Sequence, residues 1–225
     1  MVGATFPAPV KVLPIRVINM QDSADVFGTS SAIRYAAGET LTFGGKNYTN
    51  PLANQTKVIN LSLGGTLSPG SSTALELCSA VTYAKSKGVL VMAASGNDGS
   101  SKLLYPAACE DAVAVGSVGP KNAALELERA TYSSTGEGLT LSAPGGSNGD
   151  FKKNEPKYEA KQGTSQATPQ VAALAALIWS LGLETTSEGV LERMKNTALD
   201  LGSKGRDINY GFGVIQPLKA LKIAP

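Results

Sequence analysis

The sequence predicts an α/β fold in which a parallel β-sheet carries helices on its faces. Short β-rich apolar runs alternate with Ala-rich segments, the order expected for βαβ units. One run, VLVMAA at 89–94, is apolar throughout, as in strands that are buried on both faces of a parallel sheet. The chain has 225 residues, of which 42% are hydrophobic and 17% charged. This is enough for one core, so we expect a single domain over residues 1–225.

The same patterns place the individual elements. The apolar runs predict strands at 11–18, 58–63, 89–94, 112–118 and 139–143. The helical patterns cover 30–37, 72–87, the segment from Ser165 to about residue 180, and 186–196. Gly88 follows the second of these helices, where a glycine commonly ends a helix. The polar stretch 148–158 predicts a surface loop, and residues 211–221 close the chain.

Composition excludes several classes of partner. The net charge is +2, from 20 basic and 18 acidic residues that are dispersed along the chain. Without a basic stripe, nucleic acid is not an expected partner. No apolar run approaches the roughly 20 residues of a membrane helix, so no membrane partner is expected either. The start at Met1 lacks the charged and apolar regions of a secretory signal peptide.

The two cysteines and the missing histidine limit the chemistry. Cys78 and Cys109 either form one disulfide or remain buried thiols, and they are too few for a Cys-rich metal site. The sequence contains no histidine. We find no complete ligand set for a metal ion and expect no cofactor.

The sequence GTSQATPQV at 163–171 is the sharpest chemical signal. Ser165 comes at the start of a predicted helix, where backbone N–H groups are unpaired and the positive end of the helix dipole lies. Such a position can stabilise a developing oxyanion, as acyl transfer requires. The alternative is that Ser165 only caps the helix.

This segment and four others resemble the subtilase family of serine proteases. GTSQATPQVAALAAL is similar to the nucleophile helix of subtilases, with its pattern GTS-x-ATP-x-VAG. The other matches follow the family's order: VINLSLGG at 58–65, VLVMAASGNDG at 89–99, YPAACEDAVAVGSV at 105–118 and LSAPGG at 141–146. The end of the chain, DLGSKGRDINYGFGVIQPLKAL at 200–221, resembles the family's closing strand and helix. The resemblance therefore covers nearly the entire chain.

The resemblance implies a role for each matched residue. Ser165 would be the nucleophile, and the Asn97 amide would join the Ser165 N–H in the oxyanion hole. The alternative for Asn97 is an ordinary turn residue. An extended peptide would pair with the groove that the remaining matched residues line. These groove residues are Ser62, Leu63, Gly64, Gly65, Ala94, Ser95, Gly96, Gly163 and Thr164.

The sequence also departs from the family. Subtilases carry an aspartate on an early strand and a histidine in an HGTHVAG-like motif, and neither motif is present. Residues 8–17 resemble the strand that follows the histidine helix, so the expected fold lacks the N-terminal strands of the family. Asp22 in the sequence INMQDSADVFG is expected to be a solvated loop or cap residue. A Ser–Lys arrangement with Lys161 or Lys157 would be the alternative source of a base.

These observations predict a weak serine hydrolase that acts on ester bonds and, less readily, on peptide bonds. Without a general acid, the poor leaving group of an amide is hard to expel. The alternatives are an inactive fragment that binds peptides and a structural or oligomeric module. Loss of a central strand would leave two strands unpaired, which predicts rearrangement or a homo-oligomer. Because full-length relatives are typically secreted, the resemblance implies an extracellular protein.

Overall fold

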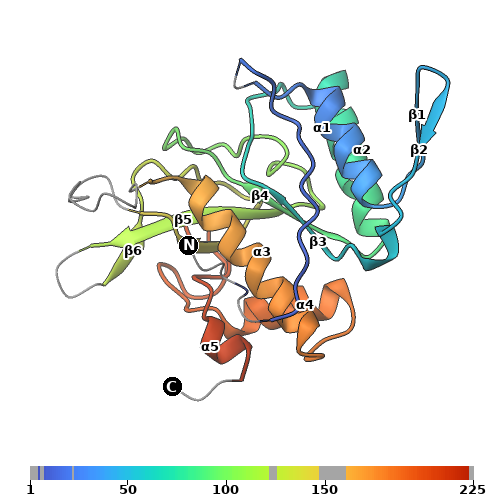
Figure 1. Ribbon diagram of the computed structural model, residues 1–225. Helices are drawn as coiled ribbons and strands as arrows, with labels where there is room; N and C mark the ends of the chain where they lie inside the picture. Colours follow the sequence, from blue (N-terminus) through green and yellow to red (C-terminus); the bar gives the residue numbers. More distant parts are fainter. Residues whose placement is uncertain (1–4, 6–7, 22, 122–125, 147–160, 223–225) are drawn as a thin grey trace, which may run out of the picture.

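The structure is a computed structural model that describes residues 5, 8–21, 23–121, 126–146 and 161–222. A five-stranded sheet lies between two groups of helices (Figure 1). Its strands are β3 (Val58–Leu61), β4 (Leu90–Ala94), β5 (Val113–Pro120), β6 (Leu127–Arg129) and β7 (Leu139–Pro144). The order is β3-β4-β5-β6, and β7 also pairs with β5. β3, β4, β5 and β7 are parallel and β6 is antiparallel, which confirms the predicted α/β fold.

Alternate residues of the central strands pack on opposite helical layers, as the pleat of a strand requires. Met92 and Val115 belong to the core beneath α3 (Thr164–Ser180) and α4 (Ser187–Thr197). Val91 and Ala114 belong to the core beneath α1 (Val26–Ala36) and α2 (Ser72–Ser86). Every residue of β4 is buried, in agreement with its continuous apolar sequence.

The helices begin and end where the sequence supplies caps. The side chains of Asp25, Ser71 and Thr186 accept hydrogen bonds from the first turns of α1, α2 and α4. After α2, Gly88 has a φ of +72°, which glycine adopts readily. The helix after Ser165 is confirmed as α3, and α5 (Pro217–Ala220) forms the end of the described chain.

The predicted strand at 11–18 is wrong. This segment is extended but forms no strand, and no strand of the described chain pairs with it. Val12 is 84% exposed and Met20 88%, so the apolar side chains of this region are not in the core. Pro14 also removes one backbone donor from any ladder. β3 is consequently the edge of the sheet.

Several short elements were not expected from the sequence. A hairpin of β1 (Leu41–Phe43) and β2 (Lys46–Tyr48) turns at two glycines with positive φ, and a 3-10 turn, η1 (Ala53–Gln55), follows it. The antiparallel strand β6 was also missed. The loop predicted at 148–158 lies outside the described residues. Among the described helices, none is both long and apolar enough to cross a bilayer.

A disulfide joins α2 to the segment between β4 and β5. The Sγ atoms of Cys78 and Cys109 are bonded, and the two residues are 31 positions apart in the sequence. Leu77 and Pro106, close to these cysteines in sequence, both line the cleft described below. The cross-link therefore connects two of its walls.

Candidate active site

Two loops and the start of a helix meet at the carboxyl ends of the parallel strands. Ser62 follows β3, Asn97 comes three residues after β4, and Ser165 lies in the first turn of α3. This edge is where open α/β sheets commonly bind ligands. α3 packs across β3, β4, β5 and β7, which fixes its N-terminus beside the ends of the strands.

Ser165 is half-buried at the mouth of this site. Its hydroxyl donates to the carbonyl oxygen of Ser62 over 3.1 Å. It lies in the first turn of α3, where N–H groups have no acceptor within the helix. The residue thus combines an accessible hydroxyl with the positive end of a helix dipole.

Thr164 fixes the orientation of the Asn97 amide. Its N–H donates to Asn97 Oδ1 over 2.8 Å, and its hydroxyl lies 3.0 Å from the same oxygen. Because Oδ1 takes these hydrogen bonds, the NH₂ group of Asn97 is the part left to donate elsewhere. Asn97 is exposed, so this donor is available to a ligand beside Ser165.

The turn before Ser165 requires glycine. Gly163 has a φ of +145°, and a Cβ there would lie 2.9 Å from Gln166 Oε1. Its N–H donates to the carbonyl of Gly145 over 2.9 Å and also lies 3.1 Å from the Tyr132 hydroxyl. This turn holds the start of α3 against the loop after β7.

Tyr132 is a positioning residue that sequence analysis missed. Its hydroxyl lies 2.7 Å from the carbonyl oxygens of both Gly145 and Gly146 and accepts from the Gly163 N–H. The hydroxyl therefore connects two segments that are separated by the undescribed residues. Only its place between two matched motifs could have drawn attention to it in the sequence.

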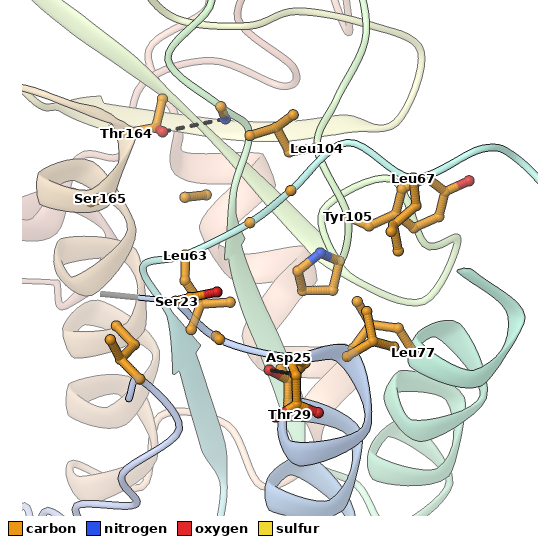
Figure 2. A pocket seen from close by; sticks show the side chains of 18 of the residues that line it. Ser23, Asp25, Thr29, Leu63, Leu67, Leu77, Leu104, Tyr105, Thr164 and Ser165 are labelled. Carbon is orange, nitrogen blue, oxygen red and sulfur yellow. Dashed lines mark hydrogen bonds between the residues drawn. The ribbon is translucent and has the colours of Figure 1, made fainter. Parts of the chain in front are cut away.

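A cleft of about 450 Å³ opens in front of Ser165. Figure 2 shows Thr164 and Ser165 at one end and Asp25 with Thr29 at the other. The predicted groove residues that line it are Leu63, Gly64, Gly65, Ala94, Gly96 and Thr164. Three others do not: Ser62 contributes its carbonyl to Ser165, Gly163 shapes the turn, and Ser95 is fully buried with its hydroxyl on the Ser134 carbonyl.

Among the described residues, no ionisable side chain forms a hydrogen bond with the Ser165 hydroxyl. Its hydroxyl makes one hydrogen bond, to a carbonyl oxygen, which cannot act as a base at neutral pH. Lys161, the alternative base, is exposed and makes no hydrogen bond to Ser165, while Lys157 and Asp22 lie outside the described residues. Within the described ranges, no group of three or more His, Cys, Asp or Glu side chains could hold a metal ion.

A family model and several known proteins match most of this chain. The model of the subtilase family (Peptidase S8) matches residues 8–213. The chain belongs to the subtilase family. The matched range includes Asn97 and Ser165.

Named relatives of this subtilase are proteases. It is 40% identical to Minor extracellular protease Epr of Bacillus subtilis over 166 residues, covering 73% of this chain and 24% of Epr. It is 36% identical to Subtilisin BL of Lederbergia lenta over 204 residues, covering 87% of this chain and 71% of that protein. The chain thus spans about a quarter of the length of Epr and about seven tenths of that of Subtilisin BL.

Solved structures give the same fold. A lanthipeptide protease superposes with a TM-score of 0.73 at 25% identity, covering 92% of this chain and 68% of that one. Sphericase superposes with a TM-score of 0.71 at 29% identity, covering 89% of this chain and 66% of its own.

Proposed function

We propose that this subtilase is a serine hydrolase in which Ser165 attacks a carbonyl carbon bound in the cleft. The observation that carries the proposal is the arrangement of Ser165, Asn97 and Thr164 at the N-terminus of α3. Attack forms a bond between the Ser165 oxygen and the carbonyl carbon, converts the carbonyl oxygen to an oxyanion and releases the hydroxyl proton to solvent water. The Asn97 NH₂ and the Ser165 N–H are the two donors that would stabilise it.

The substrate class follows from the shape of the cleft and from the family. Extended peptides fit a groove that runs along backbone segments such as Leu63–Gly65. Since named relatives are proteases, peptide-derived substrates are the proposed class. The relative called extracellular also supports an extracellular location for this chain.

The leaving group decides which bonds are cleaved. A serine hydroxyl at its ordinary pKa is a weak nucleophile, and no base accepts its proton among the described residues. Subtilisins without their full triad retain about 10³–10⁴-fold acceleration over water, a magnitude measured in that family. An activated ester can be cleaved at that level, because its leaving group departs without a proton. We therefore expect hydrolysis of activated peptide esters, with amides cleaved far more slowly.

Labelling with a fluorophosphonate tests the proposed nucleophile. The Ser165 oxygen would bond to phosphorus and release fluoride, and intact-mass spectrometry would show one added phosphonyl group. The adduct should be absent in Ser165→Ala. No adduct on wild-type protein that is folded by circular dichroism would contradict the proposal.

Substitution of Asn97 tests the oxyanion hole. Asn97→Ala should slow labelling and ester hydrolysis by about 10²–10³-fold, the loss known for the corresponding donor of subtilisin. Asp98→Ala, next to it in the same exposed turn, is the matched control and should change the rate little. Equal rates for Asn97→Ala and wild type would show that Asn97 is only a turn residue.

A peptide-binding module is the second candidate. It is favoured by one observation, that the Ser165 hydroxyl donates to a carbonyl instead of to a base. Peptide binding that is unaffected by Ser165→Ala, in a protein that forms no adduct, would support it.

We also propose that two copies associate to cover the free edge of β3. The segment 8–21 also exposes the apolar side chains of Val12, Leu13 and Met20, which a second copy could cover. Sedimentation velocity over a hundredfold range of concentration should show association that Val12→Lys with Met20→Lys weakens. A monodisperse monomer throughout would contradict it.

A further inference from the structure

We propose that the cleft selects substrates with a lysine or arginine side chain at a position remote from the bond that is cleaved, through the carboxylate of Asp25. The inference rests on the proposed function for the class of substrate, a peptide. It concerns only the end of the cleft opposite Ser165 (Figure 2).

Asp25 is the one charged side chain among the described residues that line the cleft. The remainder of the lining is apolar or neutral, with groups such as Leu63, Leu77 and Tyr105. No lysine or arginine of the described chain forms an ion pair with Asp25. An unbalanced negative charge at one end of a largely neutral cleft attracts a cation and disfavours an anion.

The Asp25 carboxylate has one oxygen available. Oδ1 accepts the Gly28 N–H over 2.7 Å and caps α1. Oδ2 accepts no hydrogen bond from the described residues, and the side chain is exposed. Because a carboxylate accepts several hydrogen bonds, Asp25 can bind a ligand through Oδ2 while Oδ1 caps α1.

Gly28 keeps this oxygen uncovered. A Cβ at residue 28 would lie 2.7 Å from Asp25 Oδ2. The backbone of Gly28 has no positive φ, so its conformation does not require glycine. Glycine weakens a helix relative to alanine, and its presence here leaves room beside Oδ2 for a ligand.

A lone carboxylate suits an organic cation better than a metal ion. Calcium takes six to eight oxygen ligands, and no cluster of three acidic groups occurs in the described chain. An ammonium or guanidinium group needs only a single charged partner, and its aliphatic stem can lie along the apolar wall. These features point to lysine and arginine.

Peptide binding provides the test. We would measure fluorescence anisotropy with labelled, N-acetylated hexa-alanine peptides in which one lysine is moved through each position. Acetyl-lysine at the same position is the neutral control for each peptide. At one position, lysine should bind about two- to fivefold more tightly, the range for an exposed ion pair, and high salt should reduce this preference.

Three variants separate the effect of the Asp25 charge from effects on the structure around it. Asp25→Asn keeps the helix cap and removes the charge, so the preference for lysine should disappear. Gly28→Ala keeps the charge and covers Oδ2, so the preference should decrease. Glu137→Gln makes the same change of net charge at a side chain that is 89% exposed and outside the cleft, and it should leave the preference intact.

The outcomes distinguish this inference from the proposed function. A preference for lysine that survives Asp25→Asn, equal binding of lysine and acetyl-lysine peptides, or no measurable binding of any peptide would overturn the inference. None of these results bears on phosphonylation of Ser165. A preference lost in Asp25→Asn supports the inference even if Ser165 forms no adduct, in which case the cleft only binds peptides.

Discussion

Two segments of this subtilase that the sequence predicts as strands have different structures. Residues 90–94, LVMAA, form β4, with strands on both sides and helices on both faces. Residues 11–18, KVLPIRVI, are extended but pair with no described strand, and Val12 is 84% exposed. A β-rich sequence therefore becomes a strand only where neighbours accept and donate its backbone hydrogen bonds.

The residues of the proposed catalytic site lie next to the well-packed core. Ser62, Asn97 and Ser165 follow or begin elements that are packed in the sheet core. Asp25, by contrast, joins the segment 8–21 to α1 and shapes only the far end of the cleft. The proposed chemistry and the proposed substrate preference thus depend on regions that differ in burial.

The largest contrast should come from placing a charge in each segment. Met92→Asp puts an unpaired carboxylate into a fully buried site and should cost more than about 4 kcal/mol of unfolding free energy. Val12→Asp should change that free energy by no more than about 0.5 kcal/mol. Urea unfolding of both variants measures the difference. A large loss in Val12→Asp would show that the segment is packed in solution.

Removing the disulfide tests how firmly the cleft walls are held. The double variant Cys78→Ala with Cys109→Ala should lose roughly 3–4 kcal/mol, from the loop-closure entropy of a 31-residue separation. Differential scanning calorimetry of the variant and wild type measures this loss. Equal midpoints would indicate that packing of α2 alone fixes these walls.

The smallest effect concerns the Lys85–Asp111 pair, at the end of the sheet opposite Ser165. Hydrogen bonds from Lys85 and Thr82 lower the pKa of Asp111 below 3.8, and the same pair raises the pKa of Lys85 above 10.5. A lowered carboxyl pKa stabilises the fold above the unfolded pKa, and this stability is lost as the pH falls through the folded pKa. The raised lysine pKa contributes stability that is complete below 10.5 and is lost as the pH rises through the higher pKa of the folded state.

Asp111→Asn isolates the charge because its amide oxygen can still accept from Thr82. We expect a loss below about 1 kcal/mol at neutral pH, since Lys85 is half-exposed and screened by solvent. The difference from wild type should shrink below pH 3.8, when Asp111 takes up a proton. A constant difference from pH 2 to 7 would show that the charge contributes nothing.

Local patterns predicted most of the elements. The continuous apolar run at β4, the glycine that follows α2 and the helical pattern after Ser165 each specify structure within a few residues. The wrong strand at 11–18 and the missed strand β6 have a common cause. Whether a short segment joins a sheet depends on distant partners, which no local period reveals.

The sequence by itself determined the family, the fold class and the choice of Ser165 and Asn97, because these depend on motifs with fixed local order. Tertiary structure decided what lies around them. Thr164 orients the Asn97 amide, Tyr132 connects the loop after β7 to the turn at Gly163, and Asp25 enters the cleft from a helix cap. The Thr164–Asn97 and Tyr132–Gly163 hydrogen bonds join residues 67 and 31 positions apart, and hydrogen bonds over such separations exist only once the chain has folded.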